Sequence, residues 1–558
     1  MSTPPISRPT TPKVKLKRHI GPIGLLFAAV GSIIGSGWLF GAYNASLIAG
    51  PIAIFSWIIA GAMVLLIGLC YAELGPMFPI SGGVVRYPHL VWGSFGSYSL
   101  GFITWIATAA LPAIETEGAL TYATRFFPFT TRASANGVTT HVLTPIGIVV
   151  AIILLAAFVL INYYGVRLFA QINNVLVWWK LFVIILVIVV FLIMALATSQ
   201  MGSMANFTSH GFAPKGWAAV FTCISTAGIT FSFLGFRQSI ELAGETSNPK
   251  RNIPFAVIGS IGITTVIYAL LQVAFTLAVP GDILAKSGSW QDLVFKNDAG
   301  PLAALASIGG MAWLAYILYF DAVISPADTG LIYTATASRV SYAMGRNANA
   351  PRWLATNNKH GVPYWSLVVT FFVGVFLLLP FPSWQQFVGF VTSATVLSFG
   401  SGPLVLALLR RQFPEMKRAF KLPGGDIIPW LAFYSANMII FWAGWDTNNK
   451  LFITVLIGYV LLVIFQLTGD RTIKPPLDFR VSAPWVLIYL AAMALFSWLM
   501  DPITHPDLFA WAFVVNIVIT GGVYWLAIRS HLPKDRMMAY IRDAEHESEE
   551  EARTLGEP

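Results

Sequence analysis

Long apolar runs separated by short polar segments dominate the hydropathy pattern of this chain. Runs of about 17–25 apolar residues have the length of a helix that crosses the hydrocarbon core of a bilayer. Counting such runs predicts about fourteen helices, of which the last four have the least defined ends. The expected spans are 22–49, 52–78, 97–123, 143–164, 175–198, 216–244, 253–279, 301–336, 363–381, 384–409, 428–445, 451–468, 483–500 and 508–528.

Composition and charge agree with an integral membrane protein. The chain is 56% hydrophobic and only 11% charged, whereas a soluble domain carries roughly 25% charged residues. Crossing the membrane at every span, with the N-terminus inside, places most of the Lys and Arg residues in cytoplasmic segments. The net charge of +9 therefore indicates orientation in the cytoplasmic membrane and not nucleic-acid binding. Cys70 and Cys223 fall in apolar segments, so no disulfide framework is expected.

Glycines interrupt two of the predicted spans. Gly31, Gly35 and Gly37 lie within seven residues of the first span, and Gly228 and Gly235 lie near the centre of the sixth. Broken backbone at membrane depth persists only where protein buries it or where it lines a cavity. Interrupted segments at matching positions of two halves indicate the central site of a transporter. The alternative for the first span is a small-residue face for close helix packing.

The five-helix separation of the two broken spans predicts two five-helix repeats of opposite orientation. It divides the chain into a cytoplasmic N-terminal tail, a ten-helix transport core, four accessory helices and a cytoplasmic C-terminal tail. These regions are 1–19, 20–410 (repeats about 22–198 and 216–410), 411–528 and 529–558. The acidic stretch 545–551 of the last region is expected to be solvated and disordered.

Short motifs in the first ten spans carry a family resemblance. They are Gly31-Ser-Ile-Ile-Gly-Ser-Gly37, Tyr71-Ala-Glu-Leu-Gly-Pro-Met-Phe-Pro79, Asn162-Tyr-Tyr-Gly165, Trp179-Lys180-Leu181 and Gly244-Glu-Thr-Ser-Asn-Pro-Lys-Arg-Asn-Ile-Pro254. Together they resemble the amino acid–polyamine–organocation (APC) superfamily of permeases. More narrowly, Arg86-Tyr-Pro88, Asp321-Ala-Val-Ile-Ser-Pro326 and Pro380-Phe-Pro-Ser-Trp384 are similar to the bacterial aspartate–proton symporter group. The resemblance implies an all-α, LeuT-like membrane fold with about four extra C-terminal helices.

The resemblance also implies where a substrate binds. In relatives, backbone amides of the first-helix break hold the substrate carboxylate, and these match Gly35, Ser36 and Gly37. Free amides at a half-helix N-terminus do favour an anion. Carbonyl groups near Ile33, and those matching Phe231 and Leu234, would take the ammonium group. Trp38 and Phe236 are candidates for the side-chain pocket, with ordinary core packing as the alternative.

Arg237 is one of two basic residues inside the predicted spans. Many relatives carry an acidic or neutral residue at this position. A guanidinium beside a broken helix offers bidentate recognition of a carboxylate, which predicts an anionic substrate side chain. The structural alternative is a salt bridge to Glu241, four residues along the same helix face.

Lys180 is the other intramembrane basic residue. A lysine at the bilayer centre costs at least about 2.5 kcal/mol, so it is usually functional. In relatives that carry it, the ammonium fills a position that sodium occupies in sodium-coupled transporters, which implies proton coupling. First-helix carbonyls near Gly31 and Ser325 are the expected neighbours, and a permanently charged structural lysine is the alternative.

Six further charged residues complete the candidate set. Asp321 could pair with Lys180 or carry a proton itself, and Asp328 lies in the same span. Glu115 and Glu117 stand about 200° apart on a helix, so one is expected to face the pathway and the other a loop or the headgroups. For Glu73, at the inner end of span two, a structural or gating contact with Arg86 or the 245–254 loop is expected.

These observations predict a secondary transporter that imports an acidic amino acid, most specifically L-aspartate, together with protons by alternating access. An amino acid exchanger and a proton-coupled permease for neutral amino acids remain open alternatives. A membrane hydrolase is excluded because all eight histidines lie in loops or tails and no Cys/His cluster exists. No enzyme activity, cofactor or metal is expected. The expected partners are the amino acid, protons and the bilayer, with the chain as a monomer or homodimer.

Overall fold

The computed structural model describes residues 20–80, 82–134, 137–164, 166–197, 201–295, 299–347, 349–358, 361–381, 383–468 and 477–553. The expected N-terminal tail, 1–19, lies outside these residues. The helices of the first half are α1 (Pro22–Ile33), α2 (Gly37–Ala49), η1 (Gly50–Ile52), α3 (Ala53–Met77), α4 (Gly83–Ala123), α5 (Pro145–Tyr164), α6 (Val166–Ala197), η2 (Met204–Phe207), α7 (Gly216–Thr226), η3 (Phe231–Arg237), α8 (Gln238–Glu241), η4 (Ala243–Glu245) and α9 (Pro249–Ala278).

The second half is also helical. It comprises α10 (Gly281–Ser287), α11 (Pro301–Ile308), α12 (Ala312–Arg346), η5 (Arg352–Ala355), α13 (Tyr364–Leu377), α14 (Trp384–Phe399), α15 (Ser401–Gln412), α16 (Ile427–Trp442), α17 (Trp445–Thr468), α18 (Phe479–Leu499), η6 (Pro506–Leu508), α19 (Phe509–Arg529) and α20 (Lys534–Arg553). A two-stranded antiparallel hairpin, β1 (Thr131–Ser134) and β2 (Gly137–Leu143), joins α4 to α5.

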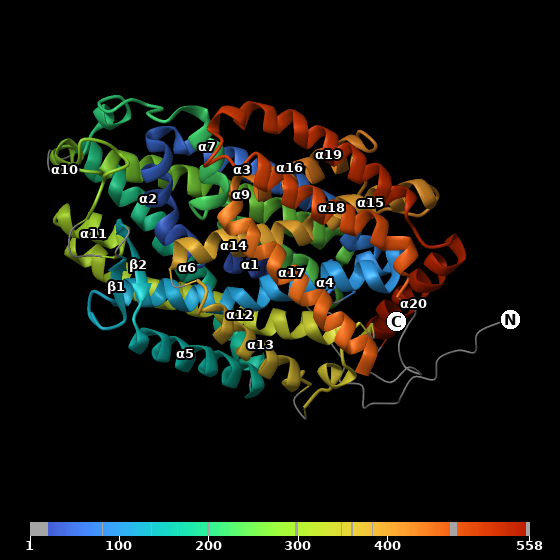
Figure 1. Cartoon of the computed structure of the whole chain (residues 1–558). Helices are drawn as coiled ribbons and strands as arrows, with labels where there is room; N and C mark the ends of the chain where they lie inside the picture. The colour runs from blue at the N-terminus through green and yellow to red at the C-terminus, as the bar shows by residue number, and fades with distance from the viewer. Residues whose placement is uncertain are drawn as a thin grey trace.

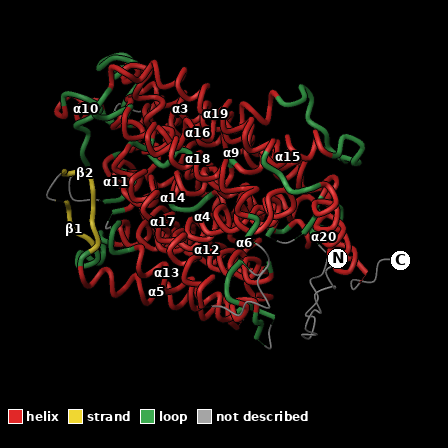
Figure 2. The backbone as a smooth tube through the Cα atoms, turned by 45° about the vertical axis from the view of Figure 1, so that its right-hand side comes forward, coloured by secondary structure: helices red, strands yellow, loops and turns green. Residues whose placement is uncertain are grey.

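The long helices run side by side between two opposite ends of the molecule (Figure 1). One end carries the hairpin, α10 and α11, and the opposite end carries α20 and the α15–α16 connection. In Figure 2 the loops gather mostly at these two ends, as expected for a membrane-spanning bundle whose backbone must bond internally within the bilayer.

Among the described residues, nine helices are long and apolar enough to cross a membrane, and the bent pair α7 with η3–α8 brings the number to ten. The count treats Gly37–Met77 as one helix, although Gly50, with φ 71°, starts the turn that divides α2 from α3. Three apolar helices, α1, α13 and α16, are shorter. α12, which is less apolar than the helices counted, has 35 residues and is about 52 Å long, enough to cross as well.

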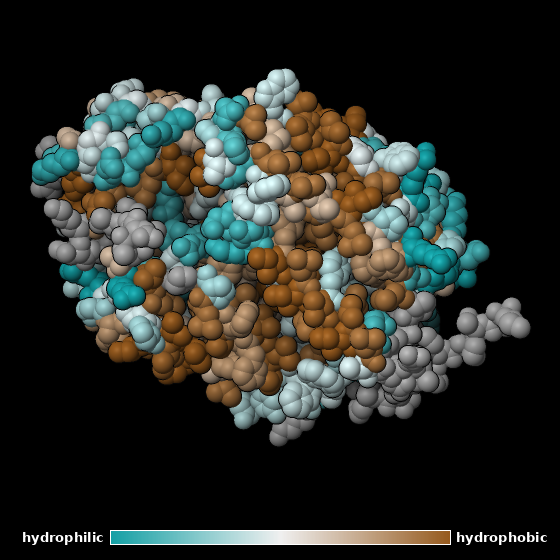
Figure 3. All heavy atoms as spheres, viewed as in Figure 1, coloured by the Kyte–Doolittle hydropathy of each residue, from teal (hydrophilic) through white to brown (hydrophobic). Residues whose placement is uncertain are grey.

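Burial separates central from peripheral helices. All of the most apolar window of Trp384–Gln412 (α14–α15) and 94% of that of α4 are buried, against 28% in α5 and 22% in α17. The peripheral helices expose apolar side chains such as Ile153 and Leu456. Figure 3 shows an apolar surface over much of the middle of the molecule, with hydrophilic residues gathered toward its ends. This is the surface that lipid chains cover.

Several element boundaries differ from the sequence expectation. The third span begins at Gly83 instead of 97 and bends at Gly93, whose φ of 71° lies in the left-handed region. The expected span 301–336 is two helices, α11 and α12, separated by a turn at Gly309–Met311. The C-terminal tail forms α20, which is helical to Arg553, and Met537, Ile541 and Ala544 are buried in its first half. The expectation of a disordered acidic end is therefore wrong for this helix.

Candidate functional site

The first span is broken between α1 and α2. Ile34 leaves the helical region, with φ −86° and ψ 84°, and the Gly35 amide donates to the Ile33 carbonyl at 3.1 Å. Other groups approach the glycines closely: a Cβ on Gly35 would lie 2.6 Å from Oε1 of Glu115, and one on Gly37 would lie 2.3 Å from Oγ of Ser232. Close approach of neighbouring groups is therefore the reason for glycine here.

The second broken segment, in the sixth span, lies directly against the first. It bends by 48° between α7 and η3–α8, and Gly228 at the bend has φ 88°. A Cβ on Gly235 of η3 would lie 2.3 Å from the backbone nitrogen of Ile33. The two breaks predicted from glycine spacing thus meet in space, as a central transport site requires.

A carboxylate from α4 already occupies part of the first-helix break. Glu115 accepts a hydrogen bond of 2.7 Å from the Ser36 amide and is 1% exposed. The structure thus places a carboxyl group at one of the amides expected to hold a substrate carboxylate. A substrate carboxylate that uses the Ser36 amide would take the place of Glu115 at this donor.

Trp384, at the start of α14, covers both breaks. Its indole Nε1 donates to Oγ of Ser36 at 2.8 Å, and its ring centroid lies 4.7 Å from that of Phe40 and 5.9 Å from that of Phe231. A Cβ on Gly228 would lie 2.6 Å from this indole. Sequence reasoning quoted Trp384 only within a family motif and assigned it no role, since nothing in its local sequence indicates contact with spans one and six.

The other candidate residues for the substrate lie around the breaks. Trp38 and Leu234 are buried, and the Ile33 carbonyl accepts a hydrogen bond of 3.2 Å from the hydroxyl of Tyr268 in α9. Phe236 packs against Phe399 of α14, with ring centroids 5.1 Å apart. Both Trp38 and Phe236 therefore make the core contacts that were the alternative to a pocket role.

Arg237 is fully buried at the end of η3. Its Nη2 lies 3.3 Å from Oε1 of Glu241, which realises the expected ion pair along the helix, and its Cζ lies 5.7 Å from the Phe399 ring centroid. Among the described residues, Nε and Nη1 of the guanidinium find no hydrogen-bond acceptor. A buried charged group with unsatisfied donors carries a desolvation cost that an anionic ligand would offset.

Lys180 reaches from α6 to the first-helix break. Its ammonium Nζ lies 2.7 Å from Oδ2 of Asp328, 2.9 Å from the Gly31 carbonyl and 3.0 Å from Oγ1 of Thr329. The expected carbonyl neighbour, Gly31, is present, whereas Thr329 occupies the place expected for Ser325. Neither Asp328 nor Thr329 had been assigned a partner from sequence, since only the packing of α6 on α12 shows which turn of α12 meets Lys180.

Asp321 and Ser325 form a separate pair on α12. The Ser325 hydroxyl lies 2.8 and 2.9 Å from the two carboxylate oxygens of Asp321, which is fully buried. The direct Asp321–Lys180 contact considered from sequence is therefore replaced by the Asp328–Lys180 ion pair.

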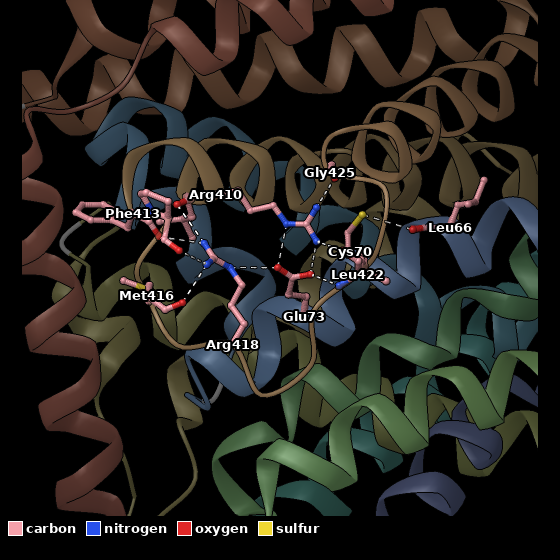
Figure 4. Close-up of polar contacts among 11 residues, drawn as sticks. Leu66, Cys70, Glu73, Arg410, Phe413, Met416, Arg418, Leu422 and Gly425 are labelled. Carbon is pink, nitrogen blue, oxygen red and sulfur yellow. Dashed lines mark hydrogen bonds and ion pairs between the residues drawn. The ribbon is translucent and has the colours of Figure 1, made fainter.

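Glu73 forms a polar cluster near the C-terminal end of α3, drawn in Figure 4. Its carboxylate accepts hydrogen bonds from the guanidinium of Arg410 and from the Leu422 amide at 2.7 Å, and it lies 3.2 Å from Nε of Arg418. These partners, from α15 and the α15–α16 connection, stand where Arg86 or the 245–254 loop had been expected. That loop instead holds the start of α1, because the Ile20 amide donates to the Glu245 carbonyl at 3.2 Å.

Glu117 does not face a loop or the headgroups, contrary to expectation. It is 1% exposed inside α4, and neither of its carboxylate oxygens accepts a hydrogen bond from the described residues. Among all the residues that the structure describes, no group of three or more His, Cys, Asp or Glu side chains is placed to hold a metal ion.

Comparison with known proteins adds to this geometry. The model of the family described as "Amino acid permease" matches residues 20–465. The chain is 34% identical over 544 residues to the glutamate/serine transporter AimA of Bacillus subtilis, covering 95% of this chain and 96% of the relative. It is 35% identical over 521 residues to the aspartate-proton symporter of the same organism, covering 91% and 96%. The branched-chain amino acid permease BcaP of B. subtilis is 26% identical over 82% of this chain and 95% of that relative.

Proposed function

Because the chain belongs to the amino acid permease family, we propose that it imports an acidic amino acid, L-aspartate or L-glutamate, together with protons. The protein is a multi-pass membrane transporter and not an enzyme. Two relatives above 30% identity are named for an acidic amino acid, one of them together with serine, and the other is named for proton symport. We further propose that both termini of the chain face the cytoplasm.

The proposal of an acidic substrate rests mainly on the buried guanidinium of Arg237. Its Nε and Nη1 groups lack an acceptor within the described structure, although the side chain is fully buried. A substrate carboxylate supplies two acceptors in the planar arrangement that a guanidinium fits. A cationic substrate would be repelled by Arg237 and Lys180 at short range. The side-chain carboxylate of the substrate would therefore bind Arg237, and its α-carboxylate and ammonium groups would bind the paired helix breaks.

The amino acid group of the substrate fits the chemistry of those breaks. The N-terminal end of α2 would present the amides of Gly35, Ser36 and Gly37 to the carboxylate. The substrate would replace the Ile33 carbonyl at the Gly35 amide and Glu115 at the Ser36 amide. Carbonyl groups at Phe231 and Leu234 would take the ammonium group. The Ile33 carbonyl would join them in exchange for its bonds from the Gly35 amide and the Tyr268 hydroxyl. The rings of Trp384 and Phe40 would close one side of the site, and their movement away from the breaks would admit the substrate.

Proton coupling is proposed from the charged groups beside the first-helix break. Lys180, with Asp321 and Ser325 nearby on α12, lies in a buried environment where a change of protonation changes the local charge strongly. Because the Lys180 ammonium contacts the Gly31 carbonyl, its environment connects directly with the substrate-binding backbone.

Radiolabelled L-aspartate uptake into proteoliposomes tests the proposal. An inward proton gradient should raise initial uptake, and replacing sodium with potassium should leave it unchanged. Unlabelled glutamate should compete, whereas leucine and arginine should not. Uptake that requires a preloaded amino acid would identify an exchanger, and competition by leucine would identify a permease for neutral amino acids.

A further inference from the structure

Many threonines inside the helices satisfy their own hydroxyl groups. The hydroxyls of Thr104, Thr108 and Thr336, for example, donate to the carbonyl four residues earlier, at 2.7, 2.6 and 2.9 Å. Thr392 and Thr395 of α14 differ from them. Both side chains are fully buried, and neither hydroxyl has a hydrogen-bond partner among the described residues. A buried hydroxyl without a partner carries a desolvation cost, which a ligand acceptor would offset.

α14 presents one face to both parts of the proposed substrate site. Trp384, on the first turn of α14, covers the helix breaks, and the Phe399 ring at its end packs against the Arg237 guanidinium. At about 100° per residue, Phe399 lies about 60° around the helix from Trp384. On the same scale Thr395 lies at about 20° and Thr392 at about 80°. Both threonines are therefore on the face of α14 that joins the breaks to Arg237.

The opposite face of α14 turns away from the site. Gly389 is about 140° from Trp384, and a Cβ on it would lie 3.3 Å from the side chain of Thr447 in α17. Ser393 lies about 180° from Trp384. It is also fully buried, and its hydroxyl also lacks a partner among the described residues. The position on the helix face is thus what separates Thr395 from Ser393.

Thr395 is the closer of the two threonines to Arg237. It precedes Phe399 by one turn, about 6 Å along the helix axis, whereas Thr392 precedes it by about 10 Å. Beside Phe399, Nε and Nη1 of the Arg237 guanidinium also lack an acceptor among the described residues. A carboxylate has two oxygens with about four lone-pair sites, so it can accept from a guanidinium and a hydroxyl together.

We propose that the Thr395 hydroxyl donates to the side-chain carboxylate of the substrate, beside the Arg237 guanidinium. The inference rests on the acidic substrate proposed above and names a second residue that recognises its side chain. The carboxylate binds between η3 and α14 and accepts hydrogen bonds from both. Because Thr395 and Trp384 belong to one continuous helix, an acidic side chain also stabilises the closed position of Trp384 over the breaks.

Thr395→Val removes the hydroxyl and keeps nearly the same volume. The Tm in detergent should stay the same or rise, because the lost hydroxyl has no partner in the closed protein. The KM for L-aspartate should rise about tenfold or more, as expected when a charged group loses a donor, and by more than the maximal rate falls. Thr395→Ser should restore the KM. Ser393→Ala is the matched control on the opposite face and should keep the wild-type KM.

A combined variant, Arg237→Gln with Thr395→Val, tests whether the two residues hold the same carboxylate. Its KM should rise by less than the product of the two separate increases, because the sites are coupled. A rise equal to that product, or a wild-type KM in Thr395→Val, would overturn the assignment. If Thr395→Val folds poorly, equal KM values in Thr395→Ser and Thr395→Ala would overturn it instead. A wild-type protein that takes up neither L-aspartate nor L-glutamate would refute the proposed function itself.

Discussion

At the scale of single residues, the site depends on glycines, which lack a side chain, as much as on its charged side chains. Gly35, Gly37 and Gly235 allow the two broken spans and Glu115 to approach within distances that a Cβ would obstruct. The charged residues are equally exacting, because Arg237, Lys180 and Asp328 are fully buried and a changed partner cannot be replaced by water. Small substitutions here should therefore have large functional effects.

Replacing Arg237 tests recognition of the substrate side chain. Arg237→Gln removes a charge-assisted pair worth about 1.5–3 kcal/mol, so the KM for L-aspartate should rise about 10–100-fold. Arg237→Lys keeps the charge without the planar fork and should give an intermediate KM. Initial-rate uptake over a range of aspartate concentrations measures both. An unchanged KM in Arg237→Gln would leave Arg237 with only its structural pair to Glu241.

Substitution of Gly37 tests the close approach of the two breaks. A Cβ in Gly37→Ala would lie 2.3 Å from Oγ of Ser232, so the variant should lose most transport. Ser232→Ala in the same chain removes that oxygen and should restore part of the activity. Gly262→Ala in α9 is the matched control, since a Cβ there meets no atom within 4 Å. Full uptake by Gly37→Ala would contradict the packing of α2 on η3.

At the scale of elements, buried ion pairs connect helices that are distant in sequence. Glu73 at the end of α3 is fully buried and joins α15 and the following connection through Arg410, Arg418 and the Leu422 amide (Figure 4). At the same end, the Arg536 guanidinium of α20 donates two hydrogen bonds to Asp478, at 2.6 and 3.1 Å, and these bonds raise the pKa of Arg536. The C-terminal helix is thereby fixed beside the bend of α4, where the Leu532 amide donates to the Val91 carbonyl at 2.9 Å.

Two adjacent arginines provide a matched test of burial. Arg410 pairs with the fully buried Glu73, whereas Arg411 pairs with Asp426 at 2.5 Å with side chains 49% and 35% exposed. Leaving a buried charge without any partner costs about 3–5 kcal/mol, and Arg410→Ala should cost part of this because Arg418 and the Leu422 amide still contact Glu73. Removing an exposed partner costs about 0.2–1 kcal/mol. Arg410→Ala should therefore lower the Tm in detergent by several times more than Arg411→Ala. Equal shifts in a thermal-unfolding assay would show that Glu73 is not the anchor of this end.

At the scale of the whole molecule, the polar ends and the apolar middle fix how the protein lies in the membrane (Figure 3). α10 lies at one end and α20 at the other (Figure 1). The excess of Lys and Arg in the loops assigned to the cytoplasm predicts that the end with α20 faces inward. The transport pathway must then open alternately to the two ends around the breaks.

Cysteine labelling in intact cells checks this orientation. The native Cys70 and Cys223 are buried, so a membrane-impermeant maleimide should react with neither. Lys286→Cys in α10 should be labelled from outside, whereas Arg542→Cys in α20 should react only after the cells are opened. Both positions are exposed in the structure. Labelling of Arg542→Cys in intact cells would mean that the C-terminal helix lies outside.

The order of apolar runs and the composition sufficed to predict an all-helical membrane protein with interrupted first and sixth spans. They sufficed because the bilayer demands long apolar helices, and a broken helix there requires glycine and a buried site. The charged candidates Lys180 and Arg237 were visible for the same reason, since a charge inside an apolar run is costly and conspicuous.

Only the tertiary structure decided which groups meet. Three contacts depend on the rotation and offset of one helix against another. Lys180 pairs with Asp328 instead of Asp321, Glu73 pairs with Arg410 instead of Arg86, and Trp384 covers the breaks. A shift of α12 by two turns, for example, would bring Asp321 to the place of Asp328 without changing the hydropathy of the helix. The apolar pattern thus sets which segments cross the membrane, and side-chain packing between helices sets which charges become partners.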